Sequence, residues 1–217
     1  MNKDIYNTLR NRIMFLEYEP GLILKEQTLA EEFGVSRTPL RTVLFRLEWE
    51  YLVKILPRTG ILISELELSS ITNVFQARLE LEAVIGTMAR DKIQPEQLSR
   101  FDALQDLCNA LKSAPEPKKL AELDIANKTI FHEAAGNPFL VETSERLYSL
   151  TFRLWYFNML KMDTKGLSRE VDAVMEDLVL LSELLRKGSP EETGRARKTQ
   201  LLKHLKRIRS SFLAVSA

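Results

Sequence analysis

The sequence predicts a mainly α-helical protein in two parts. These are an N-terminal winged helix-turn-helix with a small β-hairpin wing, and a C-terminal all-α antiparallel helical bundle. Two short helix patterns are joined by about three residues that include a glycine, which is the form of a helix-turn-helix. Two β-prone runs then flank a turn of proline and glycine. Beyond Ser69 we find only long amphipathic helix patterns, which favour a bundle. The expected domains are residues 1–66 and residues 69–217.

The composition is that of a soluble globular protein, because 45% of the 217 residues are hydrophobic and 28% are charged. The formal net charge of +1 gives no overall sign of nucleic-acid binding, so such binding must come from a local basic patch. Cys108 is the only cysteine, which excludes an intrachain disulfide and fits a reducing compartment. No apolar run approaches the roughly 20 residues that span a bilayer. We therefore expect a cytoplasmic protein with no membrane partner.

The N-terminal elements follow from periodicity and from residues that end helices. The first helix is predicted over "KDIYNTLRNRIMFLE", where apolar residues recur on one helical face until Pro20 and Gly21 break the pattern. A second, short helix is expected over "LKEQTLAEEFG", closed by Gly34. Ser36 is suited to cap a third helix, and Pro39 falls in its first turn, where the missing N–H is harmless.

The wing and the bundle are predicted from the remaining sequence. The β-prone runs 52–56 and 61–64 flank "PRTG" and predict a hairpin. Each break in the later helix pattern carries glycine, proline or a capping residue. Six helices are expected at 69–91, 95–113, 117–136, 138–162, 167–187 and 190–214.

Several polar side chains of the winged helix are placed to contact DNA. In a helix-turn-helix, the start of the second helix reaches base edges and phosphates in the major groove. That start carries four polar side chains: Ser36, Arg37, Thr38 and Arg41. Arg37 and Arg41 share a helical face, and an arginine fork can bind guanine or phosphate. The wing turn adds Arg58 and Thr59, with Gly60 allowing close approach of the backbone. Each charge alone is typical of a solvated surface, but the ordered combination predicts DNA binding.

The same stretch carries a family resemblance. "LAEEFGVSRTPLRTVLFRLEWEYLV…PRTG" resembles the DNA-binding domain of GntR-family transcriptional regulators, and "SRTPLR" and "EPG" are its most specific parts. The segments "QARLELEAVIGTMA", "LDIANKTIFHEAAGNPFL" and "KHLKRI" resemble the FCD ligand-binding domain of the FadR subfamily. With six predicted helices, the bundle is similar to the VanR type. The resemblance implies a homodimeric, ligand-responsive regulator, expected to be a repressor, which binds a pseudo-palindromic operator on double-stranded DNA.

The resemblance also implies particular DNA contacts, at Gln27, Arg37, Thr38, Arg41, Thr59 and Gly60. Gln27 stands where FadR has an arginine, so its phosphate contact should be weaker. Tyr51 stands where the family usually has glycine. We expect this difference to affect the turn into the wing more than the reading of bases.

FCD domains commonly hold a divalent metal with one aspartate and three histidines, and zinc, nickel or manganese would suit such a set. Alignment on the "GN" motif assigns the aspartate to Asp124, but the next ligand position is Lys128, whose ammonium cannot coordinate a metal. The second histidine position falls near Leu178, within a helix that has no histidine, and His204 matches the third. His132 lies about 12 Å along the helix from Asp124 and is expected to cap or pack at its helix end. No metal is therefore favoured; if one binds, Asp124 and His204 would hold it, and Glu176 or Asp177 could add a carboxylate.

We interpret Lys128 as a fixed positive charge in place of the metal, which predicts a small anionic effector, such as a carboxylate, in the bundle. Arg78, which is followed at i+4 by Glu82, matches a family arginine that often faces the cavity. The predicted effector-binding residues are Arg78, Asp124, Lys128, Arg153 and His204. The alternative for Lys128 is a solvated surface pair with Asp124.

Two other functions remain open. The bundle could serve only to dimerise a DNA-binding protein. It could also be an enzyme that uses Asp124, Lys128 and His204, but the sequence has no nucleophile elbow or phosphate loop, and an enzyme would leave the winged helix unexplained.

Overall fold

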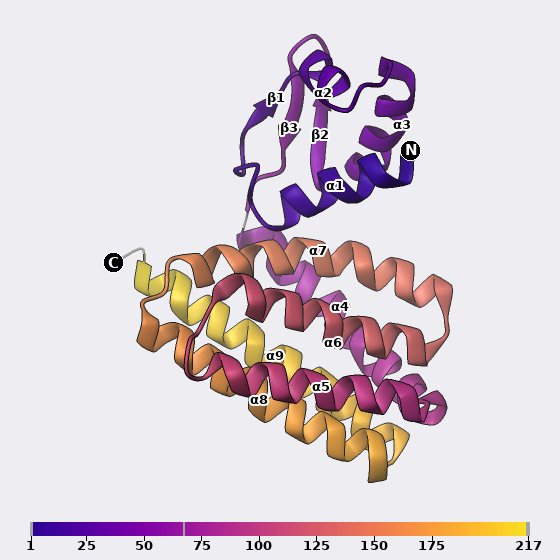
Figure 1. Cartoon of the computed structure of the whole chain (residues 1–217), viewed down its shortest axis with the longest axis vertical. Coiled ribbons are helices and arrows are strands. Elements are labelled where there is room, and N and C mark those ends of the chain that lie inside the picture. Colours follow the sequence, from indigo (N-terminus) through magenta and orange to yellow (C-terminus); the bar gives the residue numbers. More distant parts are fainter. Residues whose placement is uncertain (1, 67, 216–217) are drawn as a thin grey trace. The chain divides into compact units, whose positions relative to one another are not determined.

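The computed structural model of the chain describes residues 2–66 and 68–215, with side chains omitted for 68–70 and 211–215 (Figure 1). Residues 1 and 217, the outer limits of the predicted domains, lie outside this description. The chain divides into two compact units. One comprises Met1–Val74 with Glu145–Leu154, and the other comprises Phe75–Ser144 with Trp155–Ala217. Within the described residues, no helix is both long enough and apolar enough to cross a bilayer.

The first unit contains the predicted helix-turn-helix and wing. Its elements are α1 (Asn2–Met14), β1 (Ile23–Leu24), α2 (Glu26–Glu32), α3 (Arg37–Trp49), β2 (Val53–Leu56) and β3 (Gly60–Ile63). The strands form an antiparallel sheet of order β1-β3-β2, with Ile23 opposite Leu62 and Ile55 opposite Ile61. The hairpin lies within a residue of the predicted runs. Strand β1 was not predicted from the sequence, because two residues are too few to show an alternating pattern.

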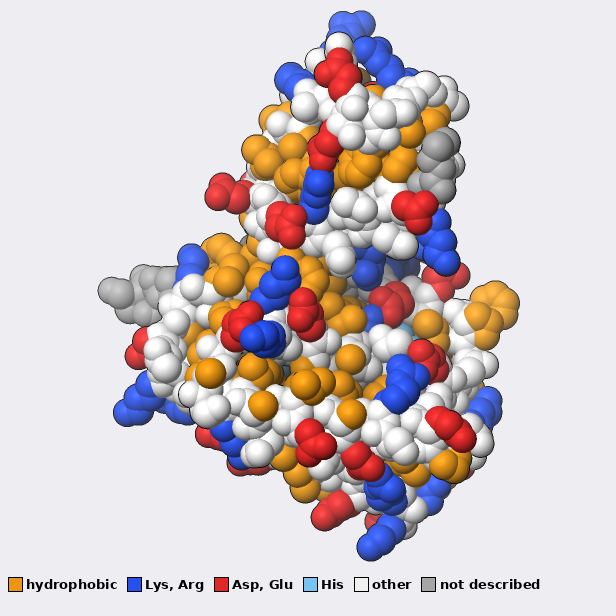
Figure 2. All heavy atoms as spheres, viewed as in Figure 1, with side chains coloured by type: hydrophobic (Ala, Val, Ile, Leu, Met, Phe, Trp, Pro, Cys, Tyr) orange, Lys and Arg blue, Asp and Glu red, His pale blue; other side chains and the backbone are white. Residues whose placement is uncertain are grey.

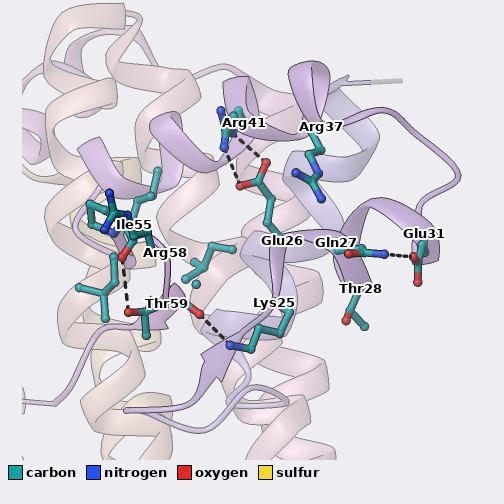
Figure 3. Close-up of a pocket in the computed structure, with 14 residues that line it drawn as sticks. Lys25, Glu26, Gln27, Thr28, Glu31, Arg37, Arg41, Ile55, Arg58 and Thr59 are labelled. Carbon is teal, nitrogen blue, oxygen red and sulfur yellow. Dashed lines mark hydrogen bonds and ion pairs between the residues drawn. The ribbon is translucent and has the colours of Figure 1, made fainter.

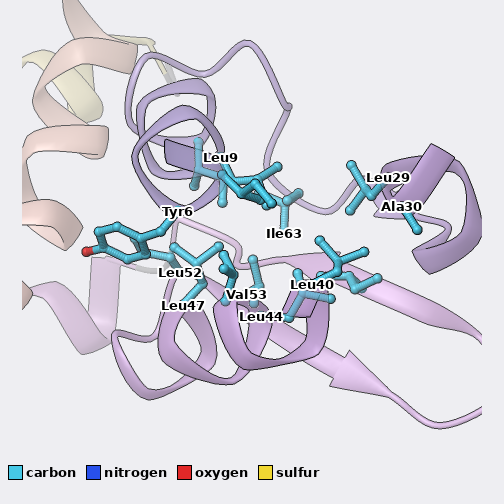
Figure 4. Close-up of a cluster of buried hydrophobic side chains, with 14 residues drawn as sticks. Tyr6, Leu9, Leu29, Ala30, Leu40, Leu44, Leu47, Leu52, Val53 and Ile63 are labelled. Carbon is cyan, nitrogen blue, oxygen red and sulfur yellow. The ribbon is translucent and has the colours of Figure 1, made fainter. Parts of the chain in front are cut away.

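The winged helix has its own hydrophobic core (Figure 4). Buried apolar side chains come from all three helices and from both hairpin strands; they include Tyr6, Leu9, Leu29, Ala30, Leu40, Leu44, Leu47, Leu52, Val53 and Ile63. Burying each large aliphatic side chain stabilises the fold by about 1.5–3 kcal/mol. This core fixes the positions from which α2, α3 and the wing present their polar ends.

Three local predictions in this unit can be compared with the geometry. Gly34 adopts φ +60 just after α2, as expected for a residue that closes a helix. Ser36 occupies the N-cap position of α3, but its side chain makes no capping hydrogen bond, so the predicted cap is wrong in that respect. Gly60 has φ +142, and a Cβ there would overlap the carbonyl oxygen of Leu24 in the neighbouring strand. Only glycine fits this point of the wing.

The C-terminal bundle is built from six helices within the described residues, as predicted. They are α4 (Leu68–Lys92), α5 (Pro95–Leu111), α6 (Pro117–Ala135), α7 (Pro138–Leu160), α8 (Thr164–Lys187) and α9 (Pro190–Val215). Helix α8 begins three residues before its predicted start, because Asp163 caps it by accepting a 2.7 Å hydrogen bond from the Gly166 N–H. Helix α5 packs against both α6 and α8.

Candidate DNA-binding groove and buried polar cluster

A groove of about 530 Å³ lies between the start of α2, the start of α3 and the wing turn (Figure 3). Six of the eight predicted DNA-contact residues line it: Gln27, Arg37, Arg41, Arg58, Thr59 and Gly60. The other two, Ser36 and Thr38, are exposed at the start of α3 but do not line the groove. Figure 2 shows Lys and Arg side chains gathered at the end of this unit that carries α2 and the wing turn. The fold thus brings together residues that are up to 33 positions apart, from Gln27 to Gly60.

The two groove arginines of α3 differ in their surroundings. The Arg41 guanidinium donates to both carboxylate oxygens of Glu26, at 2.8 and 3.2 Å. This pairing raises the pKa of Arg41, which stays charged, and holds its fork at the groove. Arg37 reaches the same groove from the first residue of the helix, where the helix dipole also favours an anion. A phosphate entering here would meet Arg37 directly and would compete with Glu26 for Arg41.

Lys25 and Glu26 are among the groove residues that were not predicted from the sequence. The Lys25 ammonium donates a 2.9 Å hydrogen bond to the carbonyl oxygen of Thr59 and so ties the start of α2 to the wing turn. Gln27 is occupied on its own helix, where it donates to Glu31 at 2.9 Å. The partners of Lys25 and Glu26 lie 34 and 15 residues away in the chain, so no local pattern could reveal them.

A buried carboxylate, Glu82, organises the interior of the bundle. It accepts hydrogen bonds from Arg78 at 3.2 Å, from Ser144 at 3.0 Å and from Arg197. His132 Nε2 lies 3.2 Å from the Ser144 hydroxyl and extends the network to α6. Burial by itself raises the pKa of Glu82, but Arg197 and Arg78 outweigh burial and hold this pKa well below its usual range. Glu82 is therefore ionised, and it links α4, α7 and α9.

Helices α4 and α9 approach each other closely, and this approach places Arg197 beside the carboxylate of Glu82. A Cβ on Gly194 would lie 2.7 Å from the Ala83 carbonyl oxygen, and one on Gly86 would lie 2.8 Å from Arg197 Cγ. Only glycines allow the two helices to approach this closely. Arg197 is buried, and its Nε has no hydrogen-bond partner among the described residues. Arg197 was not predicted from the sequence, because its position beside Glu82 depends on this long-range contact.

The predicted α6 residues lie along one helical face. Asp124, Lys128 and His132 are spaced by four residues, so their side chains follow one another at about 6 Å of rise. Lys128 and His132 are both buried, and Asp124 is half-buried. The alternative that Lys128 forms a solvated surface pair is therefore wrong. His132 does more than cap its helix end, because it joins the Glu82 network.

His204 is packed in a second polar cluster. Its ring contacts Trp155, with ring centroids 5.1 Å apart, and its Nδ1 lies 3.3 Å from Arg207 and 3.8 Å from Glu170. Glu170 in turn accepts hydrogen bonds from Trp155 at 2.9 Å and from Arg207 at 3.0 Å. Burial, reinforced by Arg207 and Arg78, holds the pKa of His204 well below its usual value. His204 is therefore neutral.

These surroundings do not fit the metal site that the family resemblance implies. The guanidinium of Arg207 lies beside the imidazole of His204. Its positive charge would repel a metal ion that His204 would have to bind. Of the two carboxylates that could have completed the site, Glu176 is exposed and Asp177 is buried, with its pKa raised by burial. Across residues 2–66 and 68–215, no three His, Cys, Asp or Glu side chains cluster in a way that could hold a metal ion.

Arg153, which was also predicted to bind the effector, belongs to the first compact unit. Arg153 is buried and donates a 2.7 Å hydrogen bond to the carbonyl oxygen of Ser64, within the first compact unit. Burial lowers its pKa to about 10. Arg78, Lys128 and His204 all belong to the second unit. A role of Arg153 in effector binding stays a prediction.

Comparisons with known proteins agree with both units. The model of the bacterial regulatory proteins of the gntR family matches residues 1–63, and the model of the FCD domain matches residues 73–207. The chain is 30% identical over 128 residues to an uncharacterised HTH-type transcriptional regulator of Agrobacterium vitis, a match covering 59% of this chain and 74% of that protein. It is 27% identical over 160 residues to the HTH-type transcriptional repressor GlaR of Escherichia coli, covering 69% and 70%.

The fold is also shared with solved structures. The structure of E. coli McbR/YncC superimposes with a TM-score of 0.83 at 18% identity, covering 97% of this chain and 98% of that one. The matched families and relatives are transcriptional regulators, not enzymes. The chain is therefore a DNA-binding transcriptional regulator that belongs to the GntR family, with an FCD domain as its C-terminal part.

Proposed function

We propose that this regulator is a homodimeric repressor in which residues 1–66 bind a short pseudo-palindromic operator and residues 69–217 dimerise and bind a small anionic effector. The proposal of a repressor is supported by the relative GlaR, whose name describes a repressor. Binding of the effector would change the mobility or spacing of the two winged helices of the dimer.

The operator site is the groove between α2, α3 and the wing. The observation that carries this proposal is that three arginines, Arg37, Arg41 and Arg58, line one groove from two different elements. Arg37→Ala or Arg58→Ala should lower operator affinity. If the lost contact is to phosphate, the slope of log affinity against log salt should fall by about 0.9 for each contact. Lys54→Ala, an exposed change in the same hairpin but outside the groove, is the matched control.

The effector site is the buried cluster around Glu82. Three cationic side chains from three helices, Arg78, Lys128 and Arg197, are buried in this part of the bundle. Two of them share the single carboxylate of Glu82. Arg197 also retains an unsatisfied buried Nε donor. An unsatisfied buried donor favours an anion that accepts hydrogen bonds, and a carboxylate suits an arginine fork. Asp124 and His204 would lie at the edge of this site and not at its centre.

A thermal-shift screen with small carboxylates and sugar acids tests the effector, followed by operator affinity measured by fluorescence anisotropy. An acid that stabilises the protein and changes operator affinity supports the proposal. Stabilisation without any effect on DNA binding would favour a bundle that only dimerises. Lys128→Met should abolish the shift, whereas Lys206→Met, at an exposed position of α9, should leave it unchanged.

We propose that the bundle works without a bound metal. Elemental analysis of the purified protein tests this directly. Near-stoichiometric zinc, nickel or manganese that is lost in Asp124→Ala or His204→Ala would overturn the metal-free proposal.

A further inference from the structure

A cleft of about 560 Å³ lies in the first compact unit, next to the wing. Its walls come from strand β3, from the connection after β3, from the start of α4 and from α7. This volume lies within the range of about 300–1,000 Å³ that is usual for small-molecule sites. No residue lines both this cleft and the groove proposed to bind DNA. Most of the lining side chains are apolar, among them Leu62, Leu66, Ile71, Val74, Leu147 and Leu150.

A buried cation, Arg153, lines the same cleft. Along α7 it follows Leu147 and Leu150 at intervals of three residues, so each of these side chains lies beside the next on the helix surface. Arg153 is only 1% exposed, and it donates a 2.7 Å hydrogen bond to the carbonyl oxygen of Ser64, a residue that also lines the cleft. Its Nε is buried and has no hydrogen-bond partner among the described residues. The guanidinium therefore continues the apolar wall of α7 with a donor that is not satisfied.

The positive charge of Arg153 is poorly compensated within the fold. Burial lowers the pKa of Arg153, and the nearby Glu65 opposes this effect only in part. The Glu65 carboxylate lies against Gly21, where a Cβ would come within 2.5 Å of its Oε1. Arg146, two turns earlier on α7, also has an unpartnered Nε, but its guanidinium lies 4.4 Å from the centre of the Trp49 ring. A buried guanidinium with an unsatisfied donor favours an anion that can accept a hydrogen bond from it.

We propose that this cleft, which we call the Arg153 cleft, binds an amphipathic carboxylic acid, with its carboxylate at Arg153 and its hydrocarbon chain along the apolar wall. A planar guanidinium suits a carboxylate, and burying the hydrocarbon removes apolar surface from water on both sides. A short polar anion would leave the apolar wall uncovered, and an uncharged hydrocarbon would leave the guanidinium without an acceptor. The Glu82 cluster belongs to the other compact unit, so this inference stands whether or not the bundle binds an effector.

Isothermal titration calorimetry of the full chain with decanoate, kept below its micelle concentration, tests the Arg153 cleft. We expect one decanoate to bind per chain. Arg153→Met should lower the affinity at least tenfold. Leu66→Glu, which brings a second carboxylate to the apolar wall, should do the same, and it should fold even if Arg153→Met does not, because Leu66 lies outside the helices and strands. The matched control is Arg146→Met, on the same helix but outside the cleft, which should leave the affinity unchanged.

Two further ligands separate the parts of the site. Decan-1-ol has the chain without the charge, and acetate has the charge without the chain, so each should bind at least tenfold more weakly than decanoate. Equal affinity for either one would overturn the inference, as would wild-type protein that does not bind decanoate or binding that survives in both cleft variants. Loss of decanoate binding in Lys128→Met, with binding retained in Arg153→Met, would assign the ligand to the Glu82 cluster and would also overturn it.

Discussion

Replacing Glu82 with glutamine would remove the carboxylate that Arg78 and Arg197 share, while keeping the size of the side chain. Glutamine can still accept one hydrogen bond through its oxygen, but it brings no charge. Both guanidiniums would then stay buried without the carboxylate that lies between them. The result measures how far this one side chain holds the interior of the bundle together.

The expected loss of stability follows from the contacts. Each charge-assisted hydrogen bond from an arginine falls from about 1.5–3 to about 0.5–1.5 kcal/mol when its acceptor becomes neutral. Two such bonds give a loss of about 2–3 kcal/mol. The positive charge that Glu82 no longer balances in a buried site adds to this loss of stability. For comparison, removing one partner of a buried ion pair lowers the free energy of unfolding by about 3–5 kcal/mol. We expect Glu82→Gln to lower the free energy of unfolding by about 3 kcal/mol.

Urea unfolding followed by tryptophan fluorescence is the assay. The chain has two tryptophans, Trp49 in the winged helix and Trp155 in the bundle, so a Trp49→Phe background reports on the bundle alone. For a slope of about 1–3 kcal/mol per molar urea, the midpoint should fall by about 1 M or more. The slope itself should stay the same, because the native fold is retained.

Glu80→Gln is the matched control, two residues earlier on the same helix. The Glu80 side chain is 72% exposed and pairs with Lys198 at the surface, so its loss should change stability by no more than about 0.5 kcal/mol. If Glu82→Gln costs less than about 1 kcal/mol, Glu82 is not the counter-ion of the two arginines. Formate, a small carboxylate, should raise the midpoint of Glu82→Gln more than that of the wild type, because it can replace the missing charge.

Three further predictions concern single positions. Gly60→Ala should lower operator affinity at least tenfold in fluorescence anisotropy, because the added Cβ overlaps the carbonyl oxygen of Leu24; unchanged affinity would contradict the role of the wing. Tyr51→Gly should stabilise the chain by about 1 kcal/mol and raise Tm by about 2–4 °C in a thermal melt, because Tyr51 adopts φ +61, and a lower Tm would refute the strain. Because the pKa of His204 is lowered in the fold, only the unfolded chain takes up a proton there just below about pH 6.5. The free energy of unfolding should therefore fall between pH 7 and 5.5, by up to about 1.4 kcal/mol per pH unit, and His204→Gln should remove that loss.

Periodicity predicted the helices of the bundle closely because each is long and ends at a glycine, a proline or a capping residue. The same reasoning could not find β1, whose two residues are held by hydrogen bonds to a strand nearly 40 positions later. It also predicted the start of α8 at residue 167, whereas the helix begins at Thr164 because Asp163 caps it. Long local patterns are visible in a sequence, and short elements fixed by distant partners are not.

In the candidate sites too, residues with a local pattern could be predicted and residues fixed by distant contacts could not. Lys128 could be selected from its spacing to Asp124, because positions four apart on a helix share a face whatever surrounds them. Arg197 could not be selected, since its place beside Glu82 depends on two glycines at the contact of α4 and α9. For Arg153, the sequence pattern could not show that its guanidinium donates to the carbonyl oxygen of Ser64, 89 positions earlier in the chain.

The two Arg–Glu pairings described above differ in exposure, and this difference affects how each could take part in binding. Arg41 and Glu26 lie at the surface, where an ion pair contributes little, so a DNA phosphate can take over Arg41 at small cost. Arg197 and Glu82 are buried, and separating them would leave a charge uncompensated in the interior. An anionic effector therefore cannot simply displace Glu82. It must add to the cluster beside Glu82, where the buried Nε of Arg197 has no hydrogen-bond partner among the described residues.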